Sequence, residues 1–278
     1  MVEHFLPTTL TETLDILDTN KVEIIAGGTD LMVQRRTWAN TLPKFDQTIN
    51  IIHVKELNFI RQEGSKLHIG ATTSYTTLLQ HPDVPQLLKD CISVLASPAL
   101  RNIATIAGNI GNASPAGDTL PILYLYDAII ELSSKHRVRY VPIQDVIVGP
   151  RKTTIEYNEL ITSIILPLHD FSTVRFDKVG GRKADAISKI SMAAAARIED
   201  GVIEDIRFAF GAVGPIIVRD TGIEEELLGR TIEDIPDVLP TILSSIASRI
   251  TPIDDQRSNK NYRSNVALNL LQDFLLTL

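Results

Sequence analysis

Near the N-terminus the sequence changes within a few residues from an apolar run to two adjacent glycines. The run 22–25 predicts a short strand, Gly27 and Gly28 follow it, and the pattern of 31–36 is typical of a helix. At such a turn several backbone N–H groups have no intrahelical partner and can converge on an anion. Glycine can adopt positive φ and lets a phosphate group approach the backbone closely. The turn therefore indicates an anion-binding loop, although glycine pairs also occur at such turns for steric reasons alone.

Two polar residues complete this first loop. Thr29 adds a hydroxyl donor, and Asp30 could cap the following helix or accept a hydrogen bond from a ligand hydroxyl. The loop lacks the G-x-G-x-x-G spacing of the doubly wound dinucleotide fold, and the strands that follow, starting with 46–54, look antiparallel. The sequence therefore predicts a different nucleotide-binding fold.

A second loop, residues 105–118, lies in the middle of an otherwise apolar region. It reads TIAGNIGNASPAGD, and this composition of small and polar residues favours tight backbone turns over a regular helix or strand. Such a segment could fold closely around a large ligand: backbone amides suit phosphate, Asn and Ser suit hydroxyl groups, and Asp118 could accept hydrogen bonds. An ordinary long surface loop has the same composition, so the segment alone leaves both interpretations open.

The rest of the pattern predicts a mixed chain whose composition changes near residue 170. Before that point we expect hairpins 57–62 with 66–71 and 128–133 with 137–141, helices 74–80 and 84–96, and a strand 160–166. After a linker at 167–170 we expect a meander of three strands, 173–179, 189–197 and 202–211, and then helices 224–228, 232–249 and 262–275. This second part predicts a separate C-terminal domain.

Composition narrows the functional classes. The 278 residues are 44% hydrophobic, and 27 Lys and Arg against 34 Asp and Glu give a net charge of −7, which argues against a nucleic-acid partner. The lone Cys91 excludes an intrachain disulfide or a cysteine-ligated cluster, and its place on an apolar stripe with no electropositive neighbour predicts a core residue. The six histidines have no zinc-site spacing. With no leader and no long apolar stretch, we expect a soluble cytoplasmic protein without a membrane span.

The two loops together resemble a known family. AGGTDL at 26–31 is similar to the first FAD-pyrophosphate loop of the flavin subunits of molybdenum hydroxylases, the xanthine dehydrogenase and carbon monoxide dehydrogenase type, and residues 105–118 are similar to the second. The resemblance continues with Phe176-Asp177-Lys178, with 182–185 and 193–195, and with 255–258 and Tyr262-Arg263. It covers essentially the whole chain in order.

The resemblance implies an α+β fold. A two-lobed FAD-binding domain of the vanillyl-alcohol-oxidase-like, PCMH type would occupy 1–170, with a small lobe at about 1–55 and a larger lobe at about 56–170. A CO-dehydrogenase-flavoprotein-like domain would occupy 171–278. The residues that the resemblance implies as FAD contacts are Ile25, Ala26, Gly27, Gly28, Thr29, Asp30, Leu31, Thr105, Gly108, Asn109, Ala113, Ser114, Gly117, Asp118, Leu166 and Lys178. For Leu166 a core role, and for Lys178 a surface role, are the alternatives.

The function implied is electron transfer by an oxidoreductase subunit that itself has no catalytic nucleophile, base or metal. Molybdopterin and 2Fe-2S clusters would belong to a large subunit and an iron-sulfur small subunit, and FAD would pass the electrons to NAD, a quinone or oxygen. The sequence departs from the family pattern in one position and lacks the feature of one family branch. Ala107 stands where the family usually has glycine, and the single cysteine excludes the extra iron-sulfur cluster that one branch carries. A stand-alone FAD oxidoreductase, which would need a His or Tyr group at its active site, and a non-catalytic scaffold are the alternatives.

Overall fold

The computed structural model describes residues 3–35, 46–183 and 185–278, which form two compact units. Unit 1 consists of residues 1–84, 96–113 and 128–167, as far as these are described. Unit 2 consists of residues 85–95, 114–127 and 168–278. Two short segments from the first half of the chain therefore belong to the same unit as its C-terminal part.

Unit 1 begins with a small parallel sheet of three strands in the order β1 (Glu3–Phe5), β3 (Gln47–Asn50), β2 (Glu23–Ile25). Helix α1 (Leu10–Thr19) lies between β1 and β2 in sequence, and Thr9 caps it by accepting a hydrogen bond from the Glu12 N–H. Neither β1 nor α1 was predicted from the sequence. The expectation that the strand at 46–54 would be antiparallel was wrong, because long connections before β2 and before β3 allow the strands to run in one direction.

An antiparallel sheet of five strands forms the larger part of unit 1. Its order is β4 (Ile60–Glu63), β5 (Lys66–Gly70), β10 (Leu160–Pro167), β6 (Ile129–Ser133), β7 (Val138–Pro142). The two predicted hairpins, β4 with β5 and β6 with β7, are confirmed. Strand β10 joins them in the centre, where seven of its eight residues are buried. The smaller elements are η1 (Lys55–Leu57), α3 (Tyr75–Gln80), α8 (Ile143–Val146), β8 (Ile147–Gly149) and β9 (Lys152–Thr153).

The segment 97–113 folds as two short helices, α5 (Pro98–Arg101) and α6 (Ile106–Asn112). The prediction of turns without regular structure was therefore wrong for this part of the second loop. Ser97 and Thr105 accept hydrogen bonds at the two helix starts, and Ile106 and Ile110 are completely buried on one side of α6. Capping and burial thus outweigh the low helix propensity of the glycines.

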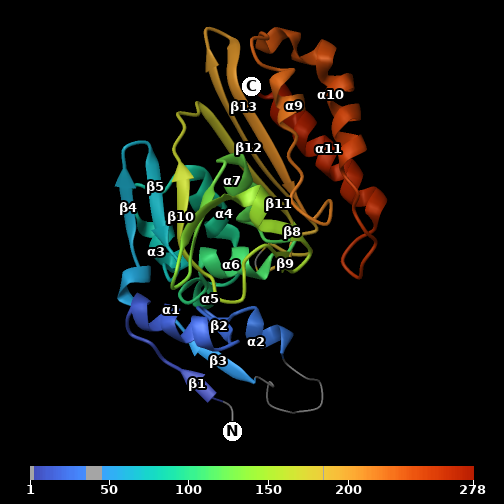
Figure 1. The fold of residues 1–278 in the computed structure, drawn as a ribbon. Coiled ribbons are helices and arrows are strands. Elements are labelled where there is room, and N and C mark those ends of the chain that lie inside the picture. Colours follow the sequence, from blue (N-terminus) through green and yellow to red (C-terminus); the bar gives the residue numbers. More distant parts are fainter. Residues whose placement is uncertain (1–2, 36–45, 184) are drawn as a thin grey trace. The chain divides into compact units, whose positions relative to one another are not determined.

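Unit 2 contains the predicted meander, an antiparallel sheet of β11 (Thr173–Val179), β12 (Ile190–Glu199) and β13 (Val202–Gly211). Helices α10 (Ile235–Arg249) and α11 (Lys260–Leu276) cover one face of this sheet (Figure 1), where Met192, Ala194 and Ala196 of β12 join their core. The connecting elements are α9 (Thr221–Glu225) and η2 (Ile232–Asp234). The predicted helix at 224–228 begins earlier than expected, because Asp220 caps α9.

The opposite face of the same sheet is covered by helices from the first half of the chain, α4 (Gln86–Val94) and α7 (Leu120–Leu125). A Cβ added at Gly211 would lie 3.2 Å from Pro121 of α7 and 2.4 Å from the Ser191 Oγ, so this side of the sheet packs tightly. Ala193 and Ala195 point to this side and are completely buried. The run of alanines in β12 is explained by the helices that approach from both faces.

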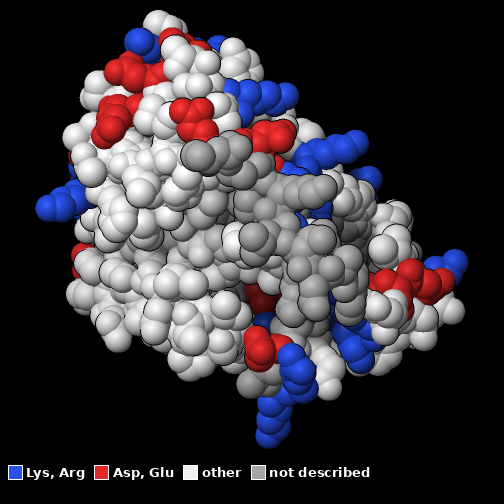
Figure 2. Space-filling model, turned by 90° about the horizontal axis from the view of Figure 1, so that it is seen from below, with Lys and Arg blue, Asp and Glu red and all other residues white. Residues whose placement is uncertain are grey.

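Acidic and basic side chains are interspersed on the face drawn in Figure 2. Among the residues that the structure describes, no helix combines the length and hydrophobicity needed to span a membrane.

Candidate cofactor site

The first glycine loop connects β2 to the short helix α2 (Leu31–Gln34) in unit 1. Gly28 has φ +67°, a left-handed backbone conformation that residues with a side chain rarely adopt. The Gly28 carbonyl accepts a hydrogen bond from the Met32 N–H, but the N–H groups of residues 27–30 have no acceptor among the described residues. Four consecutive donors are therefore left for a ligand or for water. The predicted strand and the start of the helix are confirmed, while Arg36 lies outside the described residues.

The loop is in backbone contact with the start of the second motif. A Cβ added at Gly27 would come within 2.1 Å of the Ile103 carbonyl oxygen and 2.9 Å of the Ala104 Cα. These residues lead directly into Thr105, whose hydroxyl accepts from the Gly108 N–H at 3.1 Å and begins α6. Within unit 1 the structure thus brings the first glycine loop against the beginning of the second.

Polar side chains connect α2 with the end of α6. Gln34 Nε2 donates to the Asn112 Oδ1 at 2.7 Å, and the Arg151 guanidinium donates to the same oxygen at 3.1 Å. Arg151 Nη1 also lies 3.5 Å from the Asp30 carboxylate, and its backbone N–H donates to the Ala113 carbonyl at 2.9 Å. Asp30 stands at the N-cap position of α2 but makes no capping hydrogen bond. Sequence analysis missed Arg151, since nothing in its surroundings marks it as a neighbour of the loop.

The second motif divides between the units, and its residues from Ser114 onward belong to unit 2. The Ser114 hydroxyl and carbonyl accept hydrogen bonds from the Ala116 and Gly117 N–H groups, which forms a tight turn. The Pro115 carbonyl accepts from the Ala212 N–H at 2.8 Å, which fixes this turn to the end of β13. The prediction of tight turns is confirmed for this part of the segment.

Asp118 and Lys178 form a buried ion pair in unit 2. Lys178 Nζ lies 2.7 Å from the Asp118 Oδ2, and the exposed fractions of the two side chains are 10% and 8%. The ammonium also donates to the Val94 carbonyl at the end of α4, at 3.2 Å. The second carboxylate oxygen, Oδ1, accepts from the Ser188 hydroxyl. Asp118 therefore holds Lys178, and Ser188 is a member of this group that the sequence analysis missed.

The predicted contacts thus fall into three places. Residues 25–31 with Thr105, Gly108, Asn109 and Ala113 lie in unit 1, and Ser114, Gly117, Asp118 and Lys178 lie in unit 2. Leu166 is in the central strand β10 of unit 1, and its side chain is completely buried. That burial agrees with the alternative of a core leucine.

Cys91 lies on the buried side of α4, close to this ion pair. Burial raises the pKa of the Cys91 thiol well above its ordinary value, Asp118 raises it further, and Lys178 opposes both. A thiol with a raised pKa is a poor nucleophile. The predicted core role is confirmed, but the expectation that no positive group lies nearby was wrong, because Lys178 is brought close only by the fold.

The motif near the C-terminus has a structural role. The buried Arg263 guanidinium donates to the Lys189 carbonyl at 2.8 Å and to the Asp255 carboxylate at 2.7 Å. Asp255 in turn accepts from the Arg257 and Ser258 N–H groups. These bonds fix the loop before α11 to the sheet. In the motif 182–185, Arg182 donates to the Asp185 carbonyl, and Ala184 lies outside the described residues.

A histidine and a tyrosine do meet in unit 2, as the stand-alone oxidoreductase would require. The rings of Tyr126 and His169 are 5.9 Å apart, and Arg207 donates toward the His169 ring and to the Leu125 carbonyl. Burial raises the pKa of Tyr126 to about 12. For His169, burial lowers the pKa of the ring, and the positive charge of Arg207 lowers it further. Arg207 holds His169 against the end of α7, which Tyr126 caps, and this arrangement is typical of a structural cluster.

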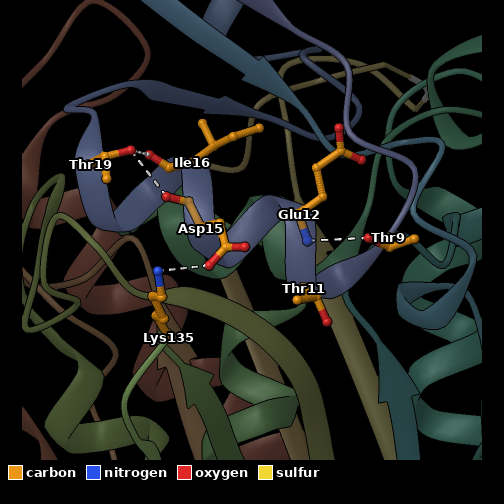
Figure 3. Close-up of a pocket in the computed structure, with 7 residues that line it drawn as sticks. All are labelled: Thr9, Thr11, Glu12, Asp15, Ile16, Thr19 and Lys135. Carbon is orange, nitrogen blue, oxygen red and sulfur yellow. Dashed lines mark hydrogen bonds and ion pairs between the residues drawn. The ribbon is translucent and has the colours of Figure 1, made fainter.

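A hollow of about 610 Å³ lies on α1 in unit 1 (Figure 3). It is lined by Thr9, Thr11, Glu12, Asp15, Ile16, Thr19 and Lys135. Lys135 forms an ion pair with Asp15 at 3.0 Å, and the Glu12 N–H donates to the Thr9 hydroxyl, so its polar groups are occupied by helix capping and surface pairing. It contains no residue of the two glycine motifs. Within residues 3–35, 46–183 and 185–278, no three His, Cys, Asp or Glu side chains are grouped to hold a metal ion.

The α+β architecture, with the first glycine loop packed against the residues that lead into the second motif, is the arrangement expected of a nucleotide-binding protein outside the doubly wound fold. Two family models match the chain: "FAD binding domain in molybdopterin dehydrogenase" over residues 1–169, and "CO dehydrogenase flavoprotein C-terminal domain" over residues 176–278. The chain belongs to the FAD-binding subunits of the molybdopterin dehydrogenases. The FAD-binding domain and the oxidoreductase class expected from the motifs are thereby confirmed.

The relatives match most of the chain. The chain is 33% identical to the nicotinate dehydrogenase FAD-subunit of Eubacterium barkeri, with 88% of this chain and 86% of the relative covered. It is 29% identical to the xanthine dehydrogenase FAD-binding subunit of Escherichia coli O157:H7, with 95% and 90% covered. Its fold matches a chain of carbon monoxide dehydrogenase from Hydrogenophaga pseudoflava with a TM-score of 0.89 at 25% identity, covering 98% and 95% of the two chains. The expected fold class is confirmed.

Proposed function

We propose that this chain is the FAD-carrying, electron-transferring subunit of a multi-subunit molybdenum hydroxylase. Its partners would be an iron-sulfur small subunit and a molybdopterin large subunit, assembled in the reducing environment of the cytoplasm. The relatives named as FAD-binding subunits of nicotinate and xanthine dehydrogenases support this assembly. When bound, FAD would accept electrons from the iron-sulfur clusters and deliver them to NAD, a quinone or oxygen.

The observation that carries the proposal is the backbone contact of Gly27 with Ile103 and Ala104. It brings the unpaired N–H groups of residues 27–30 beside the segment that enters Thr105. A pyrophosphate carries oxygen acceptors and negative charge, so backbone donors and the positive φ of Gly28 fit it. Residues 25–31 with Thr105, Gly108, Asn109 and Ala113 are the proposed contacts in unit 1.

In unit 2 we propose Ser114, Gly117, Asp118 and Lys178 as further contacts, because they complete the family motifs. The Lys178 ammonium is the group of this set that brings positive charge, and Asp118 with the Val94 carbonyl holds it in place. A fixed positive group beside a flavin favours its reduced, more negative form. Leu166 remains a proposed contact only through its backbone, since its side chain is completely buried.

FAD binding tests the proposal directly. The purified chain, freed of cofactor and mixed with FAD, should retain one flavin per chain after gel filtration, seen by its visible absorption. Gly28→Val should abolish this retention, because a β-branched residue cannot adopt φ +67° without strain, and relief of that strain would move the N–H groups of the loop. Gly64→Val is the matched control: Gly64 has φ +59° on an open turn, and this variant should still bind FAD.

Partner assembly separates the proposed subunit from a stand-alone flavoprotein. When the chain is purified from its native cell under mild conditions, iron and molybdenum should accompany it in constant ratio to flavin. Flavin binding without either metal would favour the stand-alone oxidoreductase, and retention of FAD by Gly28→Val would contradict the assignment of the loop.

A further inference from the structure

We propose that Ser188 is a positioning residue for the flavin: it fixes the Asp118 carboxylate, which fixes the Lys178 ammonium, and so sets the reduction potential of the bound FAD. This inference rests on the proposed function. It adds to that function a residue outside both glycine motifs, whose hydroxyl acts only through the side chains that it holds.

The geometry shows a relay of three side chains. Ser188 Oγ donates to Asp118 Oδ1, and Asp118 Oδ2 accepts from Lys178 Nζ at 2.7 Å. Ser188 is 1% exposed and Asp118 is 7% exposed, so water cannot readily replace either bond. A carboxylate held through both oxygens is fixed in rotation, whereas one held by Lys178 alone can turn about its χ2 axis.

The relay connects four segments of unit 2. Asp118 precedes α7, Lys178 is near the end of β11, and Ser188 precedes β12. The fourth segment is the end of α4, where the Val94 carbonyl accepts a hydrogen bond from the Lys178 ammonium at 3.2 Å. The Lys189 N–H donates to the Val179 carbonyl at 2.8 Å, which brings Ser188 to the end of β11. Among the described residues the Lys178 ammonium donates to two acceptors, the Asp118 carboxylate and the Val94 carbonyl. An ammonium has three N–H groups, so the third can donate to a ligand.

Ser191 provides a matched control. It lies three residues further on, in β12, and is paired with Lys178 across the β11–β12 ladder. It is completely buried, and its Oγ has no hydrogen-bond partner among the described residues, so it is close to Lys178 without a hydrogen bond to the relay. Ser188→Ala and Ser191→Ala therefore remove the same atom from equally buried positions. Only the first removal interrupts the relay to Lys178.

The reduction potential of the bound FAD is the decisive measurement. Ser188→Ala should shift the potential to a more negative value than in the wild-type chain and raise the dissociation constant for FAD by about fivefold, the effect of one hydrogen bond. Ser191→Ala should change neither. Ser188→Cys, which keeps the size of the side chain but offers only a weak S–H donor, should shift the potential in the same direction as Ser188→Ala and serves if that variant does not fold.

A second readout does not depend on the cofactor. In cofactor-free full-length chain labelled with ¹⁵N-lysine, the ammonium protons of Lys178 should exchange with water more slowly than those of surface lysines, and Ser188→Ala, but not Ser191→Ala, should accelerate this exchange. Equal potentials and equal exchange rates in the two alanine variants would overturn the inference. A wild-type chain that binds no FAD would overturn the proposed function, and the exchange experiment would still decide whether Ser188 holds Lys178.

Discussion

Gly27 lies in backbone contact with Ile103, and a Cβ at position 27 would come within 2.1 Å of the Ile103 carbonyl oxygen. Gly27 belongs to the first glycine-rich motif, and Ile103 lies two residues before the second, far away in sequence. No side chain can enter this contact without movement of the backbone on one side. The glycine is therefore required by packing between the motifs as well as by any ligand.

Gly27→Ala should lower the free energy of unfolding by about 1–3 kcal/mol, the usual cost of overpacking, and should weaken FAD binding. Urea denaturation and flavin titration measure the two effects. Gly111→Ala is the control, because a Cβ at Gly111 of α6 meets no atom within 4 Å and alanine favours the helix, so this variant should be at least as stable as the wild type. A Gly27→Ala chain of unchanged stability would contradict the described contact.

The ion pair of Asp118 with Lys178 gives a prediction about stability. Asp118→Ala leaves a lysine whose side chain is only 10% exposed without its carboxylate, and breaking a buried pair in this way costs about 3–5 kcal/mol. Changing both partners, with Asp118→Ala and Lys178→Met, should recover part of that loss because no buried charge remains. Urea denaturation of the three chains measures this. Equal losses in the single and the double variant would show that charge burial is not the cause.

His169 gives the folded chain a dependence on pH. Burial has the largest effect on the His169 ring and lowers its pKa from the ordinary value of 6.5, and the charge of Arg207 lowers it further. Asp205 and Asp127 raise this pKa, and Arg219 lowers it. Below about pH 6.5 the unfolded chain therefore binds more protons at this position than the folded chain. The stability that the neutral ring contributes is present above that pH and is lost as the pH falls through the lowered pKa.

His169→Asn should accordingly flatten the decrease in melting temperature between about pH 7.5 and about pH 5. Thermal denaturation followed by circular dichroism across this range measures the slope. His136→Asn is the control, because the His136 side chain is 70% exposed. An unchanged slope in His169→Asn would mean that other groups cause the pH dependence.

The C-terminal part should not fold without the first half of the chain. A fragment of residues 171–278 keeps the meander with α10 and α11 but lacks α4 and α7, so it would expose the sheet face that contains Ala193 and Ala195. We expect this fragment to aggregate or to unfold without a sharp thermal transition, whereas the full chain unfolds cooperatively. A monomeric fragment with a sharp transition would contradict the described unit 2.

Local sequence signals predicted the elements whose causes are local. The alternation of residues in the two hairpins and in the meander, and the Ser74 cap of α3, were sufficient, because strand faces and helix starts depend on near neighbours. The first glycine loop was also readable, since positive φ at Gly28 restricts that position to glycine. Composition misled the analysis at 105–112, where the buried face of Ile106 and Ile110 stabilises a helix despite the glycines.

Only the tertiary structure determined which distant residues meet. Gly27 contacts Ile103, Arg151 approaches Asp30, and Ser188 reaches Asp118 because strand pairing and helix packing fold these segments together. The membership of α4 and α7 in unit 2 has the same origin, since a sheet with two apolar faces must be covered on both. The sequence by itself therefore determined the kind of cofactor and the elements whose causes are local. The packing of segments distant in the chain decided which side chains support those motifs, because burial and charge pairing act between neighbours in space.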